Sequence, residues 1–189
     1  MESIIKRTVC LLTAILIVCG FARAEEPLSG SRRTVRTSTD IIAVAMPAAT
    51  FTTLLAIGDW EGLKQGAFTA ATALGTTYIL KYAIHKRRPD GSDDHSFPSM
   101  HTATAFADAA FLQRRFGWKI GIPAYALACY VGWGRTFAKK HDWWDVCVGA
   151  AIGAGSAYIY TRPFAKKHDL SIAPYSTSRE MGIAAAFSF

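Results

Sequence analysis

Five apolar stretches follow one another along the chain, separated by short polar segments. They cover roughly residues 40–58, 65–84, 100–113, 119–133 and 143–160. All five are rich in alanine, glycine and threonine, and none shows the strict apolar–polar alternation of a half-buried strand. Small residues also let helix backbones approach one another closely. The pattern therefore predicts an all-α fold, a bundle of five to six mostly apolar helices.

The lengths of these stretches bear on whether the helices cross a membrane, which takes about 20 apolar residues. Two of them reach that length and 143–160 nearly does, whereas 100–113 is short and contains Asp108. We expect a membrane-embedded bundle, with a compact soluble helical bundle as the alternative. If the helices alternate in direction, the loops 85–99 and 134–142 lie together on the outer side, and basic residues occupy the other side.

The first 24 residues have the layout of a secretory signal peptide. Two basic residues precede an apolar run over 9–21, and Ala22 and Ala24 stand where a signal peptidase reads small side chains. An uncleaved first transmembrane helix is the alternative for residues 1–24. Either interpretation places the following residues on the far side of the membrane.

The rest of the chain divides by composition. Residues 25–38 are polar, and we interpret them as a flexible lead-in. The residues at 38–40 are of types that often begin a helix. Pro47 would kink a helix that began much earlier. The helical-bundle domain is expected over 39–170, and the tail 171–189 carries a strand-like alternation, typical of a short strand or a disordered end.

Charge narrows the range of partners. The chain carries 21 Lys and Arg against 14 Asp and Glu, a formal net charge of +7. Such a balance suits phosphate groups, anionic lipids or nucleic acid. Because export and apolar helices leave no continuous basic face, we expect membrane lipids and no nucleic acid as partners.

Two of the four cysteines, Cys129 and Cys147, lie beyond the leader. They have neither Cys-x-x-Cys nor histidine spacing, so they indicate no metal site. We interpret them as buried small apolar residues, with a single disulfide bridge as the alternative.

The first of three polar clusters closes the second apolar stretch. Lys81 and Arg88 are seven residues apart, and on a helix they would project from one face as a clamp for a dianion. The alternative is a basic helix end at a membrane surface, which would include Lys86 and Arg87.

The second cluster, Ser96 to His101, opens the next helix. The free N–H groups of a first helical turn, together with the Ser99 hydroxyl, form an anion site. His101 stands beside them, where a proton donor to a leaving group would be needed. A capping serine and a structural histidine are the alternative.

The third cluster contains Arg135, His141 and Asp145. A carboxylate four residues after a histidine can fix the imidazole on a helix, which makes the ring a candidate nucleophile toward phosphorus. Arg135 adds a planar fork that matches phosphate oxygens. A surface ion pair at a helix start is the alternative.

Together the clusters resemble the signature of the type-2 phosphatidic acid phosphatase superfamily, which also contains bacterial acid phosphatases and vanadium haloperoxidases. Its parts read K-x6-R-P, P-S-G-H and S-R-x5-H-x3-D. The matching residues are Lys81, Arg88, Pro89, Pro98, Ser99, His101, Arg135, His141 and Asp145. Met100 replaces the usual glycine and Gly134 the usual serine, and the resemblance covers about residues 40–161.

The resemblance implies a role for each matching residue. His141 would attack phosphorus, Asp145 would hold it, and His101 would protonate the leaving oxygen. The phosphate-binding residues would be Lys81, Arg88, Ser99, Met100 and Arg135. The resemblance implies no metal and no other cofactor.

From these features we expect a metal-independent phosphatase that hydrolyses a lipid phosphate monoester or pyrophosphate through a phosphohistidine intermediate. Its site would face the periplasm from the bacterial inner membrane. The alternatives are a soluble periplasmic non-specific acid phosphatase, a vanadium haloperoxidase, and a non-enzymatic helical membrane protein that binds anionic lipid.

Overall fold

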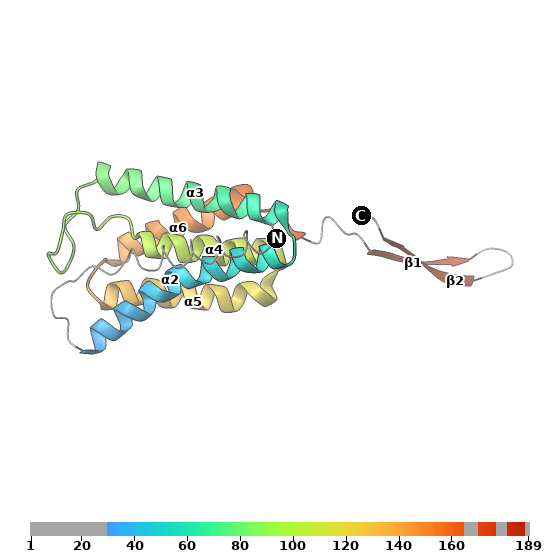
Figure 1. Ribbon diagram of the computed structural model, residues 1–189, viewed down its shortest axis with the longest axis horizontal. Helices are drawn as coiled ribbons and strands as arrows, with labels where there is room; N and C mark the ends of the chain where they lie inside the picture. The colour runs from blue at the N-terminus through green and yellow to red at the C-terminus, as the bar shows by residue number, and fades with distance from the viewer. Residues whose placement is uncertain (1–29, 165–169, 177–180, 188–189) are drawn as a thin grey trace, which may run out of the picture.

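The computed structural model describes residues 30–164, 170–176 and 181–187, with side chains described as far as Phe164. In this part of the chain five helices form an elongated bundle, and a two-stranded antiparallel sheet follows (Figure 1). The elements are α2 (Gly30–Ala56), α3 (Trp60–Ala83), α4 (Met100–Phe116), α5 (Trp118–Phe137), α6 (Trp143–Tyr160), β1 (Leu170–Ser176) and β2 (Met181–Phe187). The predicted all-α bundle is confirmed, and the described residues of the tail form the two paired strands. The predicted leader, 1–24, lies outside the described residues.

The start of α2 differs from the expectation. The helix begins at Gly30, so the prediction of a lead-in over 25–38 is wrong from that residue onward. Ser38 and Thr39, expected to cap the helix, instead donate their hydroxyls to carbonyl oxygens three residues earlier within it. Pro47 is accommodated inside the helix. The hydroxyl bonds explain the error, because the same residue types serve helix ends and helix interiors.

Helix α4 lies at the centre of the bundle and packs against the other four helices (Figure 1). Its closest approach is to α6, where a Cβ atom added to Gly153 would lie 2.1 Å from the Ala103 carbonyl oxygen. A Cβ atom at Gly149 would lie 2.6 Å from the Ser99 carbonyl oxygen. One turn further, the Ser99 amide donates to the Asp145 carbonyl at 3.0 Å. The two glycines therefore bring the first turns of α4 and α6 into contact.

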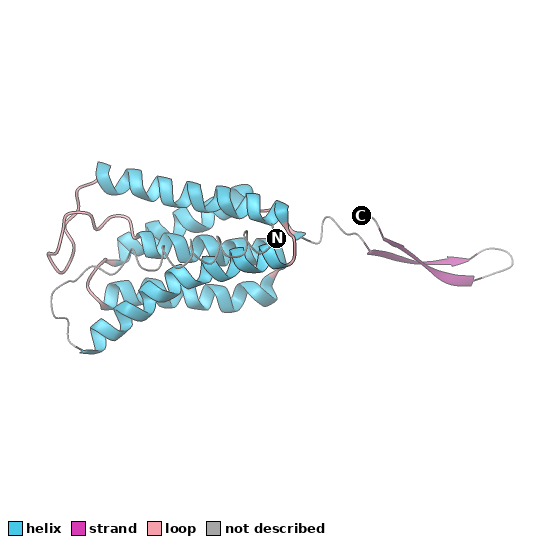
Figure 2. Cartoon of the chain, in the orientation of Figure 1, coloured by secondary structure: helices cyan, strands magenta, loops and turns pink. Residues whose placement is uncertain are grey.

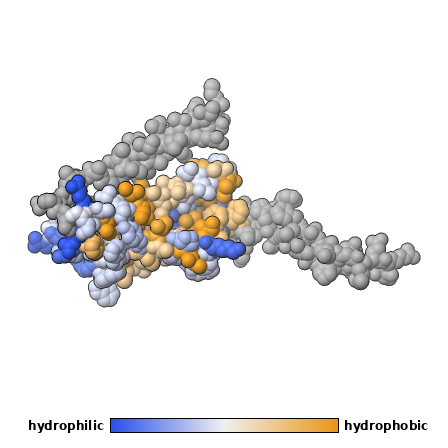
Figure 3. Space-filling model, turned by 90° about the horizontal axis from the view of Figure 1, so that it is seen from below, coloured by the Kyte–Doolittle hydropathy of each residue, from blue (hydrophilic) through white to orange (hydrophobic). Residues whose placement is uncertain are grey.

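Small side chains fill the interior and large apolar ones cover the outside. Most of the buried apolar residues are alanines, whereas many isoleucine, tyrosine and tryptophan side chains are exposed. Hydrophilic residues gather at one end of the bundle, and apolar residues cover its middle (Figure 3). Among the described helices, α2 alone combines the length and hydropathy that a membrane crossing requires.

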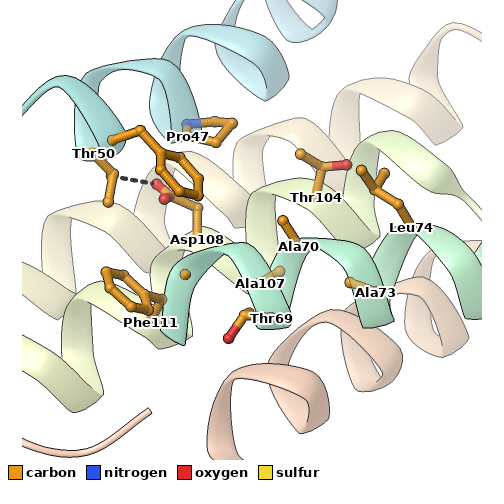
Figure 4. Close-up of a pocket in the computed structure, with 12 residues that line it drawn as sticks. Pro47, Thr50, Thr69, Ala70, Ala73, Leu74, Thr104, Ala107, Asp108 and Phe111 are labelled. Carbon is orange, nitrogen blue, oxygen red and sulfur yellow. Dashed lines mark hydrogen bonds between the residues drawn. The ribbon is translucent and has the colours of Figure 1, made fainter. Parts of the chain in front are cut away.

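Asp108, a charged residue within the apolar sequence of α4, faces inward. Its carboxylate is buried and accepts a 3.1 Å hydrogen bond from the Thr50 hydroxyl on α2 (Figure 4). The two residues line a pocket between α2, α3 and α4 whose other walls are mainly small and apolar. Asp108 therefore joins two helices at some distance along the bundle from the polar clusters.

Both cysteines point outward, contrary to the sequence interpretation. Cys129 on α5 and Cys147 on α6 are exposed and unbridged. The inward positions beside them belong to smaller residues, Ala128 and Gly149, which let the helices approach. At Gly149 even a Cβ atom would lie 2.6 Å from the Ser99 carbonyl oxygen, so a cysteine side chain would not fit there.

We predict that Gly153→Ala destabilises the fold, because the new methyl group must push α6 away from the α4 backbone. Overpacking of this kind costs about 1–3 kcal/mol. Thermal unfolding measures the effect. Gly155→Ala on the same helix is the matched control, since its Cβ would meet nothing within 4 Å, and alanine favours helix there. Equal melting temperatures for the two variants would contradict the role given to Gly153.

Candidate active site

The residues of all three sequence clusters lie at one end of the bundle, where the loops 84–99 and 138–142 meet (Figures 1 and 2). The loops are joined by an ion pair between Lys140 Nζ and Asp90 Oδ2, 2.7 Å apart. The structure thus assembles residues from helix ends and from the loops between them into one site.

His141 and Asp145 stand at the start of α6. The His141 side chain is buried, and its Nδ1 lies 3.6 Å from Asp145 Oδ2. A reciprocal cap at this helix start fixes the carboxylate: the Asp145 amide donates to Asp142 Oδ1 at 3.0 Å, and the Asp142 amide donates to Asp145 Oδ2 at 3.1 Å. The same carboxylate therefore closes the helix end and faces the imidazole.

The electrostatic surroundings keep His141 neutral. The pKa of His141 falls from 6.5 to about 4, mainly because the ring is buried. The neighbouring Asp145 carboxylate opposes this shift, whereas the charges of Arg135, Arg88 and Lys81 add to it. The three cations of the sequence clusters are thus close enough to act on one ring. At neutral pH this histidine carries a lone pair that can attack an electrophile.

Two further residues hold Asp145, and sequence analysis gave neither of them a role in the site. Lys86 Nζ lies 2.7 Å from Asp145 Oδ1 and also pairs with Asp142. The Ser96 hydroxyl, fully buried, donates to Asp145 Oδ2. Lys86 therefore does more than end a basic helix, because its ammonium binds these two carboxylates.

Arg88 reaches the site from a loop, and the expectation that it shares a helix face with Lys81 is wrong. Helix α3 ends at Ala83, and Ile84 is extended. The residue before a proline avoids helical conformation, and Arg88 precedes Pro89. The Arg88 side chain is held by its own loop, with Nε 2.7 Å from an oxygen of the Asp93 carboxylate.

Lys81 does sit in the last turn of α3, as expected. Its Nζ donates to the carbonyl oxygens of His95 at 2.7 Å and Pro98 at 3.1 Å. Lys81 therefore anchors the segment that leads into α4 and, at the same time, contributes positive charge to the site.

The first turn of α4 points its N-terminal end toward the site, as an anion site there would require. Ser99 is the N-cap residue but makes no side-chain cap, and its hydroxyl accepts a 2.9 Å hydrogen bond from Thr102. The amides of Met100 and His101 belong to the first turn, where N–H groups have no acceptor within the helix. Such amides favour a negatively charged ligand.

Arg135 and His101 share a partner that sequence analysis treated only as a helix start. Asp40, on α2, accepts a hydrogen bond from Arg135 Nη1, and its Oδ1 lies 3.1 Å from His101 Nε2. The Arg135 side chain is buried, and its Nε has no hydrogen-bond partner among the described residues. An unpaired guanidinium donor in this place fits a phosphate oxygen.

Packing against α2 explains why Gly134 replaces the serine of the signature. A Cβ atom there would lie 2.4 Å from Thr39 Cγ2 and 3.1 Å from Val35 Cγ1. Helix α2 therefore occupies the space that a serine side chain would need, and this same approach brings Asp40 to Arg135.

The arrangement combines a neutral buried imidazole facing a carboxylate, a second imidazole, three cations and a helix N-terminus. These are the groups that bind a phosphoryl group and transfer it. Among the described residues, no cluster of histidine, cysteine and carboxylate side chains suits a metal ion. A helical bundle with this site belongs to the class of phosphoryl-transfer enzymes.

Comparison with known proteins gives the family. The family model of the PAP2 superfamily matches residues 63–169. The lipid A 4'-phosphatase of Helicobacter pylori is 32% identical over 133 residues, which cover 65% of this chain and 67% of that protein. The lipid A 1-phosphatase of Porphyromonas gingivalis is 38% identical over 94 residues, and these span 48% of this chain but 21% of that longer protein. The crystal structure of Aquifex aeolicus LpxE superposes with a TM-score of 0.61 at 24% identity, over 79% of this chain and 93% of that one.

The chain belongs to the PAP2 superfamily and is a phosphoric ester hydrolase of that type. Asp40 lies before the region that the family model matches.

We predict that Gly134→Ser, which restores the usual residue of the signature, lowers stability and turnover because the new side chain collides with Thr39. Adding Thr39→Ser removes the methyl group in the way and should recover much of both. Melting temperature and turnover measured on the two single variants and the double variant form a double-mutant cycle. Additive losses would show that the clash is not their cause.

We predict that acid destabilises the fold through His141. Its folded pKa lies below its ordinary value, so the unfolded chain takes up the proton first and stability falls as pH drops from about 6.5 toward 4. The full shift corresponds to about 3 kcal/mol. Unfolding of the wild type and His141→Asn between pH 7 and pH 4.5 measures the effect. The variant should lose less stability, and parallel pH curves would refute the assignment.

Proposed function

We propose that the protein removes phosphate from a phosphorylated lipid through a phosphohistidine intermediate. One observation supports this above the others. A neutral, buried His141 lies beside Asp145, and three cations from separate segments act on its ring.

In the first step His141 Nε2 attacks phosphorus, since Nδ1 faces Asp145. An N–P bond forms as the bond to the leaving oxygen breaks, and His101 gives that oxygen its proton. Charge on the phosphoryl oxygens is stabilised by Lys81, Arg88 and Arg135 and by the first-turn amides of α4.

In the second step water attacks the phosphohistidine. His101, now neutral, takes a proton from the water as the N–P bond breaks and inorganic phosphate leaves. His141 returns to its neutral form, so the cycle restores both histidines. Lys86 and Ser96 keep Asp145 in place throughout by occupying its other lone pairs.

We further propose that the lipid is a lipid A phosphate. The two curated relatives are named as lipid A 4'- and 1-phosphatases, which supports this class above other lipid phosphates. The aromatic side chains near the site suit an amphipathic substrate, since the Tyr82 ring lies 4.9 Å from the His95 ring between centroids and Trp144 is 75% exposed at the start of α6.

The outside of the bundle supports a place in the membrane. Exposed tryptophans mark both ends: Trp133 and Trp143 near the site, and Trp60 and Trp118 at the far end. Exposed aliphatic side chains lie between them, as in helices that present large apolar residues to lipid. We propose that the site faces the periplasm at the outer surface of the bacterial inner membrane.

We predict that wild-type protein in detergent releases phosphate from lipid A, with slower release from phosphatidate and p-nitrophenyl phosphate. His141→Ala should abolish turnover, and Asp145→Asn should reduce it strongly. Radiolabelled phosphate should be trapped on His141 as an acid-labile adduct, and EDTA should leave the rate unchanged.

The matched control is His85→Asn, because His85 is an exposed histidine of the loop 84–99 that the mechanism does not use. This variant should keep wild-type turnover. Phosphate trapped on another residue, or turnover retained by His141→Ala, would contradict the mechanism. Equal rates on all three substrates would leave the mechanism standing and refute the lipid A assignment.

A further inference from the structure

Asp40 contacts two residues of the signature from a helix that carries no part of it. Its Oδ1 lies 3.1 Å from His101 Nε2 and accepts a hydrogen bond from Arg135 Nη1. On its other side, Arg36 Nε lies 3.8 Å from Asp40 Oδ2. One carboxylate thus joins α2 to the start of α4 and the end of α5.

The charges around His101 are mostly positive. Burial lowers the pKa of His101 below its ordinary value, and the charges of Arg135 and Arg88 lower it as well, whereas Asp40 raises it. A proton donor must nevertheless carry its proton when the leaving group departs. Among these groups, Asp40 alone supplies the compensating negative charge.

We propose that Asp40 is a positioning residue of this site, which fixes His101 and Arg135 relative to each other and stabilises protonated His101. The inference rests on the proposed function, since donation to the leaving oxygen is what requires the proton. As the P–O bond breaks, the proton passes from His101 to that oxygen. Asp40 keeps its charge and its hydrogen bond to the neutral ring.

The test compares Asp40→Asn with the wild type. Asparagine keeps an oxygen that accepts from both donors but removes the charge. Loss of the carboxylate partner of a metal-bound histidine costs roughly 10- to 100-fold in affinity or activity, and we take the same range for His101. We expect a fall of this size in kcat for lipid A phosphate, whose leaving group needs a proton. p-Nitrophenyl phosphate needs none, so its kcat should fall much less.

Asp108→Asn is the matched control, since it removes a buried carboxylate from α4 away from the site. Its rates on both substrates should match the wild type. Equal losses on the two substrates for Asp40→Asn would indicate a structural role only. An increase in turnover would mean that Asp40 competes with phosphate for Arg135. Either result overturns the proposal.

A second measurement needs no turnover. Nuclear magnetic resonance of labelled histidine follows the titration of His101, whose pKa should be lower in Asp40→Asn than in the wild type and unchanged in Asp108→Asn. An unchanged pKa in Asp40→Asn would refute the inference. If the wild type released no phosphate from any substrate, the proposed function would fail, and this titration would still decide whether Asp40 stabilises the imidazolium.

Discussion

The close contact between α4 and α6 is the constraint on which the site depends. At Gly149 and Gly153 the two helices approach until a single methyl group would overlap a carbonyl oxygen. This spacing lets the Ser99 amide reach the Asp145 carbonyl. The anion-binding turn of one helix and the histidine–carboxylate pair of the other then share one end of the bundle. With larger residues at these positions, both sequence motifs would survive, but they would lie apart.

The same demand for small residues explains the hydropathy of the chain. Interior alanines, threonines and glycines are only mildly apolar, and large apolar side chains are left for the outer surface. The mean hydropathy of a helix combines these interior residues with the large apolar residues outside. Among the described helices, only α2 reaches the mean hydropathy and length of a candidate membrane span. A linear average cannot separate the outward side of a helix from the side that packs against other helices, whereas the exposed fractions of the individual side chains do so.

The sequence predicted the helices well, and the residues of its three clusters do lie at one end of the bundle, because spacing within each cluster reports local structure. It placed Arg88 on a helix by counting residues, although the following proline argued against that. Asp40, Lys86 and Ser96 were given no role in the site, for another reason. Each reaches the site only through tertiary packing, with a partner 49 to 95 residues away along the sequence. Composition and periodicity carry no signal for such contacts, and a helix start or a basic run explained these residues locally.

Carboxylate side chains form ion pairs with several of the cations of the site. Arg88 is bound to Asp93, Arg135 to Asp40, and Lys86 to Asp145. The cost of ordering these long side chains is therefore met when the protein folds, before any phosphate arrives. Electrostatic stabilisation of a transition state is effective when the charges need no reorganisation. Lys81 achieves the same through two carbonyl oxygens, so each of these four cations has a fixed position before an anion binds.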